Sequence, residues 1–132
     1  MKFHDFYIID IKTGTIGTET TIVEPKQTAK QMGSGTLNVL SSPALTAIME
    51  GTAYRSIEDQ LPEGFTTVGI QMNLAHKRAS KPGEVITCTS EVTKFEGRKV
   101  FFSITASDSH GEVGAAEHIR YIVNAKEFLG RI

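Results

Sequence analysis

The chain lacks several residues and patterns on which common kinds of site depend. Its 132 residues include one cysteine, Cys88, and no tryptophan. A single cysteine cannot form an internal disulfide or a cysteine-rich zinc site, and the histidines and acids are too scattered to suggest a metal-ligand motif. No run of about eighteen apolar residues is present, so we expect no membrane-spanning helix. Cys88 lies in the strand-like run VITCTSEV and is interpreted as an inert, buried thiol.

Charge of one sign is also missing. The formal net charge is −1, with acids and bases mixed along the chain, so bulk charge indicates neither nucleic-acid binding nor attraction to an anionic membrane. Asp5 and Asp10 interrupt the apolar start of the chain, which therefore lacks a signal-peptide core. We expect a cytoplasmic protein whose residues 1–132 form one domain large enough for a hydrophobic core.

One long helix is predicted over residues 42–59, SPALTAIMEGTAYRSIED. Ser42 is expected to be its N-cap and Pro43 its first helical residue. Pro62 and Gly64 prevent the helix from continuing. The preceding segment, 24–40, contains Pro25 and two glycines and is expected to be irregular.

Strands are predicted at 15–23, 68–76, 84–95, 99–107 and 113–123, where β-branched residues or period-two alternation dominate. The last strands are joined by short turns, which is typical of an antiparallel sheet. A curved antiparallel sheet wrapped around one long central helix is the economical packing of these elements. The sequence therefore predicts an α+β fold of the hotdog type.

Glu50 is an unexpected residue in the predicted helix. At 100° per residue it lies within about 60° of mostly apolar neighbours, namely Pro43, Thr46, Ala47, Ala53, Tyr54 and Ile57. Burying an unpaired carboxylate costs several kcal/mol and favours its protonation. A glutamate at this position therefore indicates either a neutralising partner or a role in chemistry.

Two further residues could share a pocket with Glu50. His76 ends the strand whose apolar residues include Met72 and Leu74, and it is assigned to the same face as they are. A carboxylate beside an imidazole can activate water, although a histidine there can equally be a structural partner. Ser42 either caps the helix only or offers a hydroxyl beside free backbone amides. No G-x-S-x-G motif is present.

Two residues on the strands are candidates for binding a substrate. Gly69 lies inside a strand, which indicates either a close approach to its backbone or a bulge that curves the sheet. Arg120 shares one face of the last strand with His118 and could bind an anion or pair with an acid such as Glu117. His4 and His110 are interpreted as surface residues.

Residues 41–126, about two thirds of the chain, carry a family resemblance in three segments: SSPALTAIME, TVGIQMNLAHKRASKPGE and EVTKFEGRKVFFSITASDSHGEVGAAEHIRYIV. The helix ending in Met-Glu, the G-x6-H strand and the closing G-x-x-x-H-x-R strand occur in the order and spacing of the fluoroacetyl-CoA thioesterase-like family of hotdog proteins, which this chain resembles. The resemblance implies a catalytic set of Ser42, Glu50 and His76 at a dimer interface, with Gly69 and Arg120 near the substrate.

The resemblance therefore implies an acyl-CoA thioesterase that works as a homodimer, with CoA as part of the substrate and no other cofactor. The family's fluoroacetyl enzyme has a phenylalanine-bearing lid ahead of the helix, whereas KQTAKQMGSGTLNVL has no aromatic residue. Thioester chemistry is thus implied more strongly than fluoroacetyl selectivity. Three alternatives stay open at this point: a non-catalytic acyl-CoA or ligand-binding module, a hydratase or dehydratase, and a Glu50–His76 pair that only stabilises the core.

Overall fold

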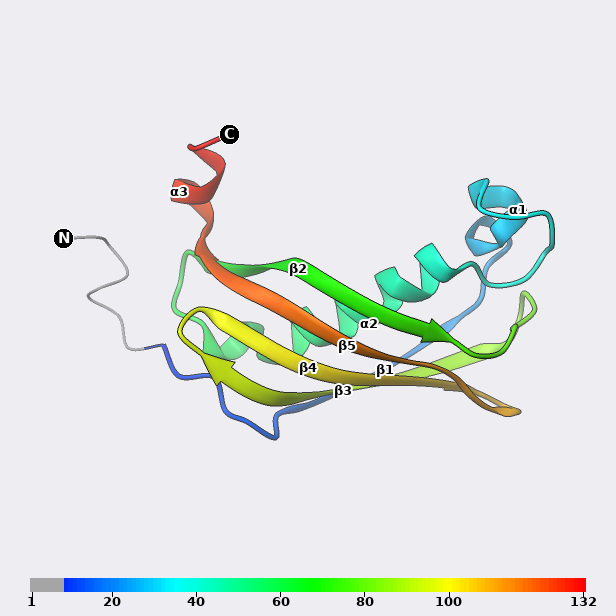
Figure 1. The fold of residues 1–132 in the computed structure, drawn as a ribbon, viewed down its shortest axis with the longest axis horizontal. Coiled ribbons are helices and arrows are strands. Elements are labelled where there is room, and N and C mark those ends of the chain that lie inside the picture. The colour runs from blue at the N-terminus through cyan, green and yellow to red at the C-terminus, as the bar shows by residue number, and fades with distance from the viewer. Residues whose placement is uncertain (1–8) are drawn as a thin grey trace.

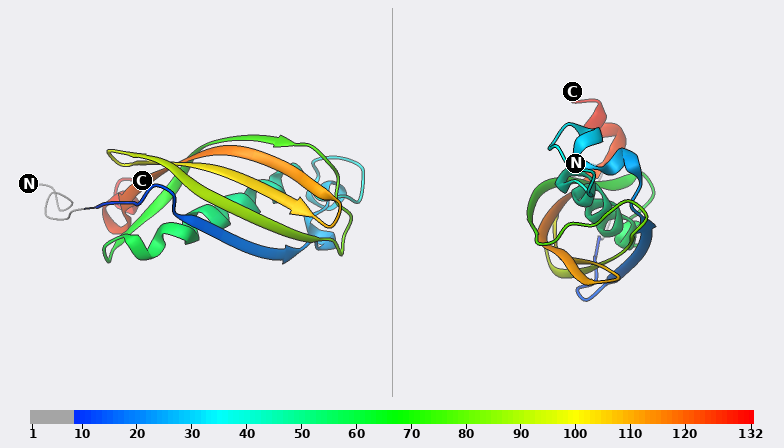
Figure 2. Two further views of the ribbon diagram at one scale, coloured as in Figure 1. Left: turned by 90° about the horizontal axis from the view of Figure 1, so that it is seen from below. Right: turned by 90° about the vertical axis from the view of Figure 1, so that its right-hand side faces the viewer.

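The computed structural model describes residues 9–132, so the prediction for His4 lies outside the described residues. A five-stranded antiparallel sheet curves around the long helix α2 (Ser42–Ile57), which runs along its concave side (Figures 1 and 2). The end-on view in Figure 2 shows the sheet enclosing the helix on several sides. The architecture predicted from the sequence is confirmed.

The order of strands places β2 at one edge of the sheet. The strands are β1 (Ile16–Ile22), β2 (Phe65–His76), β3 (Val85–Glu96), β4 (Lys99–Asp108) and β5 (Gly111–Asn124). They lie in the order β1-β3-β4-β5-β2, and every pairing is antiparallel. Within residues 9–132, β2 pairs only with β5, and its other side presents backbone N–H and C=O groups that a further strand could use.

Short helical elements occupy regions with weaker sequence signals for regular structure. The segment expected to be irregular contains η2 (Pro25–Gln27) and α1 (Ala29–Met32), and η3 (Glu58–Gln60) continues the end of α2. Helix α3 (Ala125–Leu129) was not predicted; it follows β5 and stands away from the sheet, whereas α1 lies beside the amino end of α2 (Figure 1).

The hydrophobic core lies between α2 and the concave face of the sheet. One row of helix residues at four-residue spacing is fully buried: Leu45, Met49, Ala53 and Ile57. It packs against sheet residues that include Phe102 and Ile104. Burying each large apolar side chain contributes about 1.5–3 kcal/mol, so this row fixes the position of the helix on the sheet.

Two smaller predictions about the core and surface are confirmed. Cys88 is fully buried, and burial raises the pKa of its thiol, which suits the inert role expected for it. The His110 side chain is exposed in the turn between β4 and β5.

The prediction that Ser42 caps the helix is wrong. The N-cap is Ser41, whose buried hydroxyl accepts a hydrogen bond from the amide of Ala44 at 3.1 Å. Ser42 and Pro43 are the first helical residues. The sequence offers two adjacent serines, and either could cap. The choice of Ser41 leaves the hydroxyl of Ser42 free for another partner.

The prediction of one alternating face along β2 is also wrong for the first half of the strand. A bulge at Ile70 shifts the register between Gly69 and Gln71, and the extra residue reverses which side chains face inward. Before the bulge Phe65 and Thr67 are buried, Val68 is only partly buried, and Ile70 itself is 50% exposed. After the bulge Met72, Leu74 and His76 share the inner face as predicted.

The two adjacent serines provide a test of the cap assignment. We expect Ser41→Ala to lower the free energy of unfolding by about 1 kcal/mol, because it removes the side-chain acceptor for an unpaired helix amide. Ser42→Ala is the matched control and should have a smaller effect on stability. Urea denaturation followed by circular dichroism measures both. A larger loss for Ser42→Ala than for Ser41→Ala would contradict the assignment.

Candidate active site

The carboxylate of Glu50 lies over the backbone of Gly69. A Cβ added to Gly69 would lie closer to Oε2 of Glu50 than real Cβ atoms approach other atoms, and 3.2 Å from Nη1 of Arg120. The absence of a side chain at Gly69 therefore makes room for the carboxylate. The bulge one residue later curves the strand at the same place, so both explanations considered for this glycine hold.

Glu50 is not a member of the buried row of α2, and the expectation that it sits within the apolar stripe is wrong. Its side chain is 40% exposed and faces the edge strand β2 from the border of the buried row. The stripe expected around it includes Pro43 and Ala47, which are exposed in the single chain. The carboxylate is thus balanced by a partner on one side and open to solvent on the other.

That partner is Arg120. Its Nη1 lies 3.6 Å from Oε2 of Glu50, although Arg120 is only 8% exposed. Nε of Arg120 donates to the hydroxyl of Thr67 at 2.7 Å and Nη2 to the carbonyl of the same residue at 3.0 Å. The guanidinium carbon also lies 5.7 Å from the centre of the Tyr54 ring, within the range of a cation–π contact.

His118 supplies the remaining contact to the guanidinium. Its ring is 1% exposed, and Nη1 of Arg120 donates to Nε2 of His118 at 3.2 Å. On the other side of the ring, Nδ1 donates to the carbonyl of Gln71 at 2.7 Å. Burial is the main cause that lowers the pKa of His118, and the charge of Arg120 lowers it further.

A second polar pair lies at the amino end of α2. The hydroxyl of Ser42 and Nδ1 of His76 are 2.8 Å apart. Nε2 of His76 is buried and has no hydrogen-bond partner among the described residues. Burial lowers the pKa of His76, so its neutral form prevails at neutral pH. A buried ring nitrogen without a partner can accept or donate a proton when another group approaches.

A cavity of about 350 Å³ adjoins this pair. Its lining includes Ser42 and His76 together with the two cationic residues that follow β2, Lys77 and Arg78. Main-chain and apolar groups from the segment before α2, including Val39 and Leu40, complete the wall. The cavity can therefore hold a small molecule against the serine–histidine pair.

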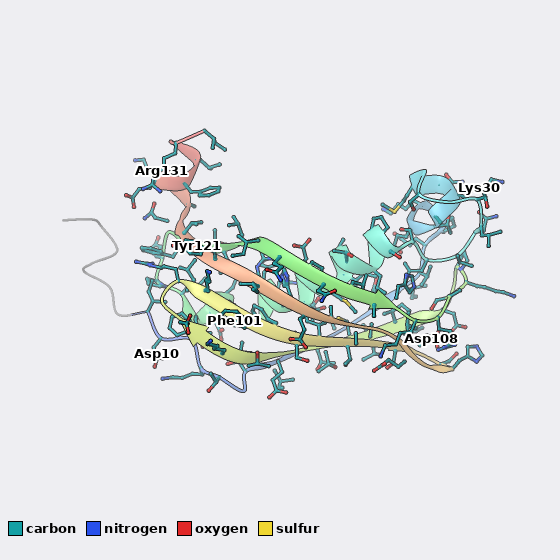
Figure 3. The ribbon with its side chains drawn as sticks, in the orientation of Figure 1. Asp10, Lys30, Phe101, Asp108, Tyr121 and Arg131 are labelled. Carbon is teal, nitrogen blue, oxygen red and sulfur yellow. The ribbon has the colours of Figure 1, made fainter. Side chains whose placement is uncertain are left out.

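A hydrogen-bonded clamp holds this end of the molecule in place. Asp108, at the end of β4 (Figure 3), accepts hydrogen bonds from Arg78, from Ser80 at 2.8 Å and from the amide of His110 at 2.8 Å. Burial opposes ionisation of Asp108, but these donors outweigh it and lower its pKa to about 2. Leu40 donates its amide to the carbonyl of Ser80, which links the clamp to the start of α2.

The two groups of residues are separate within one chain. Ser42 and Glu50 are eight residues apart on α2, a distance of about 12 Å along the helix axis. Among residues 9–132, Glu50 pairs with Arg120 and His76 pairs with Ser42, so Glu50 and His76 do not form the core-stabilising pair considered above. The structure brings together Ser42 with His76, and Glu50 with Gly69 and Arg120.

His118 and Thr67 are the contributors to the site that sequence reasoning missed. His118 was noted only as sharing a face with Arg120, and Thr67 was overlooked because the bulge reverses the alternation around it. Arg120 was expected to be able to pair with Glu117, but Glu117 is exposed on the opposite face of β5. The sequence signal that could have identified His118 is its position two residues before Arg120, on the same face of one strand.

Two kinds of feature are absent from residues 9–132. No three histidine, cysteine, aspartate or glutamate side chains converge there in a way that could hold a metal ion. None of the helices in that range has the length and apolar character needed to cross a bilayer.

Comparison with known proteins identifies the family. The model of the family described as fluoroacetyl-CoA-specific thioesterase matches residues 23–126. This chain belongs to that family. The resemblance found in the sequence is thereby confirmed, and as a member of the family the protein is a thioester hydrolase.

Individual relatives agree with this assignment. The chain is 23% identical over 128 residues to the fluoroacetyl-CoA thioesterase of Streptantibioticus cattleyicolor, and the match covers 92% of each chain. A solved structure of the fluoroacetyl-CoA thioesterase superposes with a TM-score of 0.88 at 23% identity, covering 92% of this chain and 95% of the other. A hot-dog-like protein from Thermanaerovibrio acidaminovorans gives 0.84 at 25% identity, with 99% and 94% covered. The hotdog fold is confirmed.

The contact between Glu50 and Gly69 predicts the effect of a methyl group at the glycine. In this thioesterase, Gly69→Ala should lower the stability by about 1–3 kcal/mol, because the new Cβ displaces the carboxylate. Glu50→Asp withdraws the carboxylate by one methylene, so adding it to Gly69→Ala should recover part of the loss. Thermal unfolding of the two single variants and the double variant measures this coupling. Strictly additive effects would show that the carboxylate does not occupy the space above Gly69.

Proposed function

We propose that this thioesterase hydrolyses a small acyl-CoA to the free acid and CoA in sites shared between two copies of the chain. Ser42, Glu50 and His76 are the proposed catalytic set, and Gly69 and Arg120 contact the substrate. The observation that carries the proposal is the division of these residues into two incomplete groups beside the same unpaired strand edge, β2.

The geometry of β2 supports sharing between two copies. Antiparallel pairing of two β2 strands about a two-fold axis at Asn73 would place the bulge residue Ile70, which adjoins Gly69, opposite the partner's His76. Glu50 lies over Gly69, and Ser42 contacts His76. The pairing would therefore bring the carboxylate of one copy toward the serine–histidine pair of the other. It would also cover Ile70, which is 50% exposed in the single chain.

The proposed chemistry needs a polarised carbonyl and an activated water. The amide of Gly69 or the hydroxyl of Ser42 would donate a hydrogen bond to the thioester oxygen and stabilise its negative charge. Glu50, held as a carboxylate beside Arg120, would take a proton from water, whose oxygen attacks the carbonyl carbon. Alternatively, the carboxylate would attack directly and form an anhydride that water then hydrolyses. Both routes break the same carbon–sulfur bond.

The CoA leaving group needs little help from a proton donor such as His76. A thiol ionises near pH 8.5, so CoA leaves as a comparatively stable thiolate. When Nδ1 of His76 accepts from Ser42, its unpartnered Nε2 carries the remaining hydrogen and can donate a hydrogen bond to the thiolate or to Glu50. The proton that Glu50 takes from water is then available to the thiolate. Lys77 and Arg78 line the adjoining cavity and could attract the phosphates of CoA.

The acyl group is proposed to be small, and fluoroacetyl selectivity is not part of the proposal. Residues 24–40, which lead into α2, contain no aromatic side chain that could form a phenylalanine-bearing lid. A panel of acetyl, fluoroacetyl, propionyl and butyryl thioesters, each on CoA and on acyl carrier protein, identifies both the acyl group and the carrier.

Turnover of Glu50→Gln tests the reaction. We expect this variant to lose about 10²–10⁴-fold in kcat on the preferred acyl-CoA, because an amide can neither take a proton from water nor attack as a carboxylate does. Glu91→Gln is the control, since Glu91 is exposed on β3. Release of free thiol measures both variants. Equal turnover by wild type and Glu50→Gln would refute a catalytic Glu50, and CoA binding without turnover by either would favour the binding module.

Mixing two inactive variants tests whether the site is shared. Glu50→Gln and His76→Ala chains, unfolded together and refolded, would form mixed dimers with one intact site if Glu50 acts with the partner's His76. Random pairing should restore about one quarter of wild-type activity, because half of the dimers are mixed and each has one good site. Sedimentation analysis checks that dimers form. A mixture no more active than its two components would mean that both residues act within one chain.

A further inference from the structure

Among residues 9–132, His118 is the fully buried titratable side chain beside the site that has no role in the proposed chemistry. It lies on β5, two residues before Arg120 and on the same face. Its ring is 1% exposed, yet both of its nitrogens are hydrogen-bonded. Burying a polar ring costs free energy unless its nitrogens are hydrogen-bonded, and these two hydrogen bonds offset that cost. The position of the two partners therefore indicates what His118 does.

The two partners of His118 fix its protonation state. The carbonyl of Gln71 can only accept, so Nδ1 must carry a hydrogen and donate it at 2.7 Å. The guanidinium of Arg120 can only donate, so Nε2, 3.2 Å from Nη1, must be without a hydrogen. The ring is therefore neutral, with its hydrogen on Nδ1. A second hydrogen on Nε2 would point one cationic donor at another.

We propose that His118 is a positioning residue: its unprotonated Nε2 holds the guanidinium of Arg120 against the carboxylate of Glu50, and protonation at Nε2 releases this contact. The inference rests on the proposed function, in which Glu50 acts as a carboxylate and Arg120 lies near the substrate. His118 itself touches neither water nor substrate in this scheme. It makes the site sensitive to acid through Arg120.

The groups that face His118 determine the pH range in which its contact with Arg120 is lost. From α2 it faces the carboxylate of Glu50, and on its own strand it faces Arg120; the contacts from β2 and β4 are the uncharged carbonyl of Gln71 and the ring of Phe102, 5.9 Å away. Burial and Arg120 together outweigh Gln71 and Glu50, which lowers the pKa below its usual 6.5. The contact should hold at neutral pH and be lost as the pH falls below 6.5.

Two substitutions separate positioning from simple packing. Gln at position 118 is expected to keep an oxygen near the place of Nε2, where it accepts from Arg120, but it cannot be protonated in this range. Phe fills a similar volume and offers no acceptor. We expect His118→Gln to retain kcat within a few-fold and His118→Phe to lose at least about tenfold, because a buried charged donor is left without its acceptor. His110→Gln, in the exposed turn of the same hairpin, is the control.

The dependence of kcat on pH distinguishes these roles further. His76 also has a pKa below 6.5, so wild-type activity should fall on the acid side through loss of two neutral histidines. His118→Gln should remove one of these ionisations and make the acid limb less steep, whereas His110→Gln should leave it unchanged. An acid limb of His118→Gln identical to that of wild type, or full activity of His118→Phe, would overturn the proposal.

Nitrogen-15 NMR of the wild-type histidines tests the proposal without using turnover. Long-range couplings should show His118 with a hydrogen on Nδ1 and none on Nε2 at pH 7, and titrating below 6.5, with the Arg120 side-chain signals shifting at the same midpoint. This result, together with no thioesterase activity, would retain the contact and reject the proposed function. A hydrogen on Nε2 at pH 7, or Arg120 signals that do not shift as His118 titrates, would overturn the inference even in an active enzyme.

Discussion

A buried guanidinium must have its donors satisfied and its charge balanced, and three residues around Arg120 meet this requirement. Thr67 supplies a hydroxyl and a carbonyl, His118 supplies a ring nitrogen and Glu50 supplies the opposite charge. Each of these depends on something else in the fold. Thr67 faces inward only because of the bulge, and Glu50 can reach the guanidinium only because Gly69 has no side chain.

The two serines at the start of α2 show how a structural and a chemical task can be divided between neighbours. Ser41 is buried and satisfies a helix amide, while Ser42 is exposed and pairs with His76. The Asp108 clamp then fixes the loop after β2 and the residue before Ser41. The position of the Ser42–His76 pair is thus set from both sides by residues that take no part in it.

Much of the fold followed from the sequence because period and turn signals agreed. Consecutive strands with short turns and one helix with a sharp end leave few ways to pack, and the predicted strand limits agree with the observed ones to within about three residues. Helix α3 was missed because five residues carry too little periodicity to stand out. The family motifs located Ser42, Glu50, His76, Gly69 and Arg120, whose catalytic and binding roles stay predictions.

What the sequence could not provide was the relation between these residues. Strict alternation assigned Val68 and Ile70 to the core, and a single inserted residue reversed that assignment. Helical geometry put Glu50 near apolar positions, but it could not tell that the edge strand beside it would be the one bearing a glycine. Apart from His118 on its own strand, the partners of Arg120 come from α2 and β2, which are distant in the chain, so no local pattern predicts these contacts.

The bulge at Ile70 has a consequence for the spacing of the G-x6-H motif. Gly69 and His76 are seven positions apart, an odd number, and in a regular strand such residues point to opposite faces. Both face the helix here, because the paired stretch of β5, from Arg120 to Gly114, advances only six positions where β2 advances seven. An odd interval between two residues that must face the same side of a sheet therefore indicates a bulge between them, and this interval can be recognised in the amino-acid sequence alone.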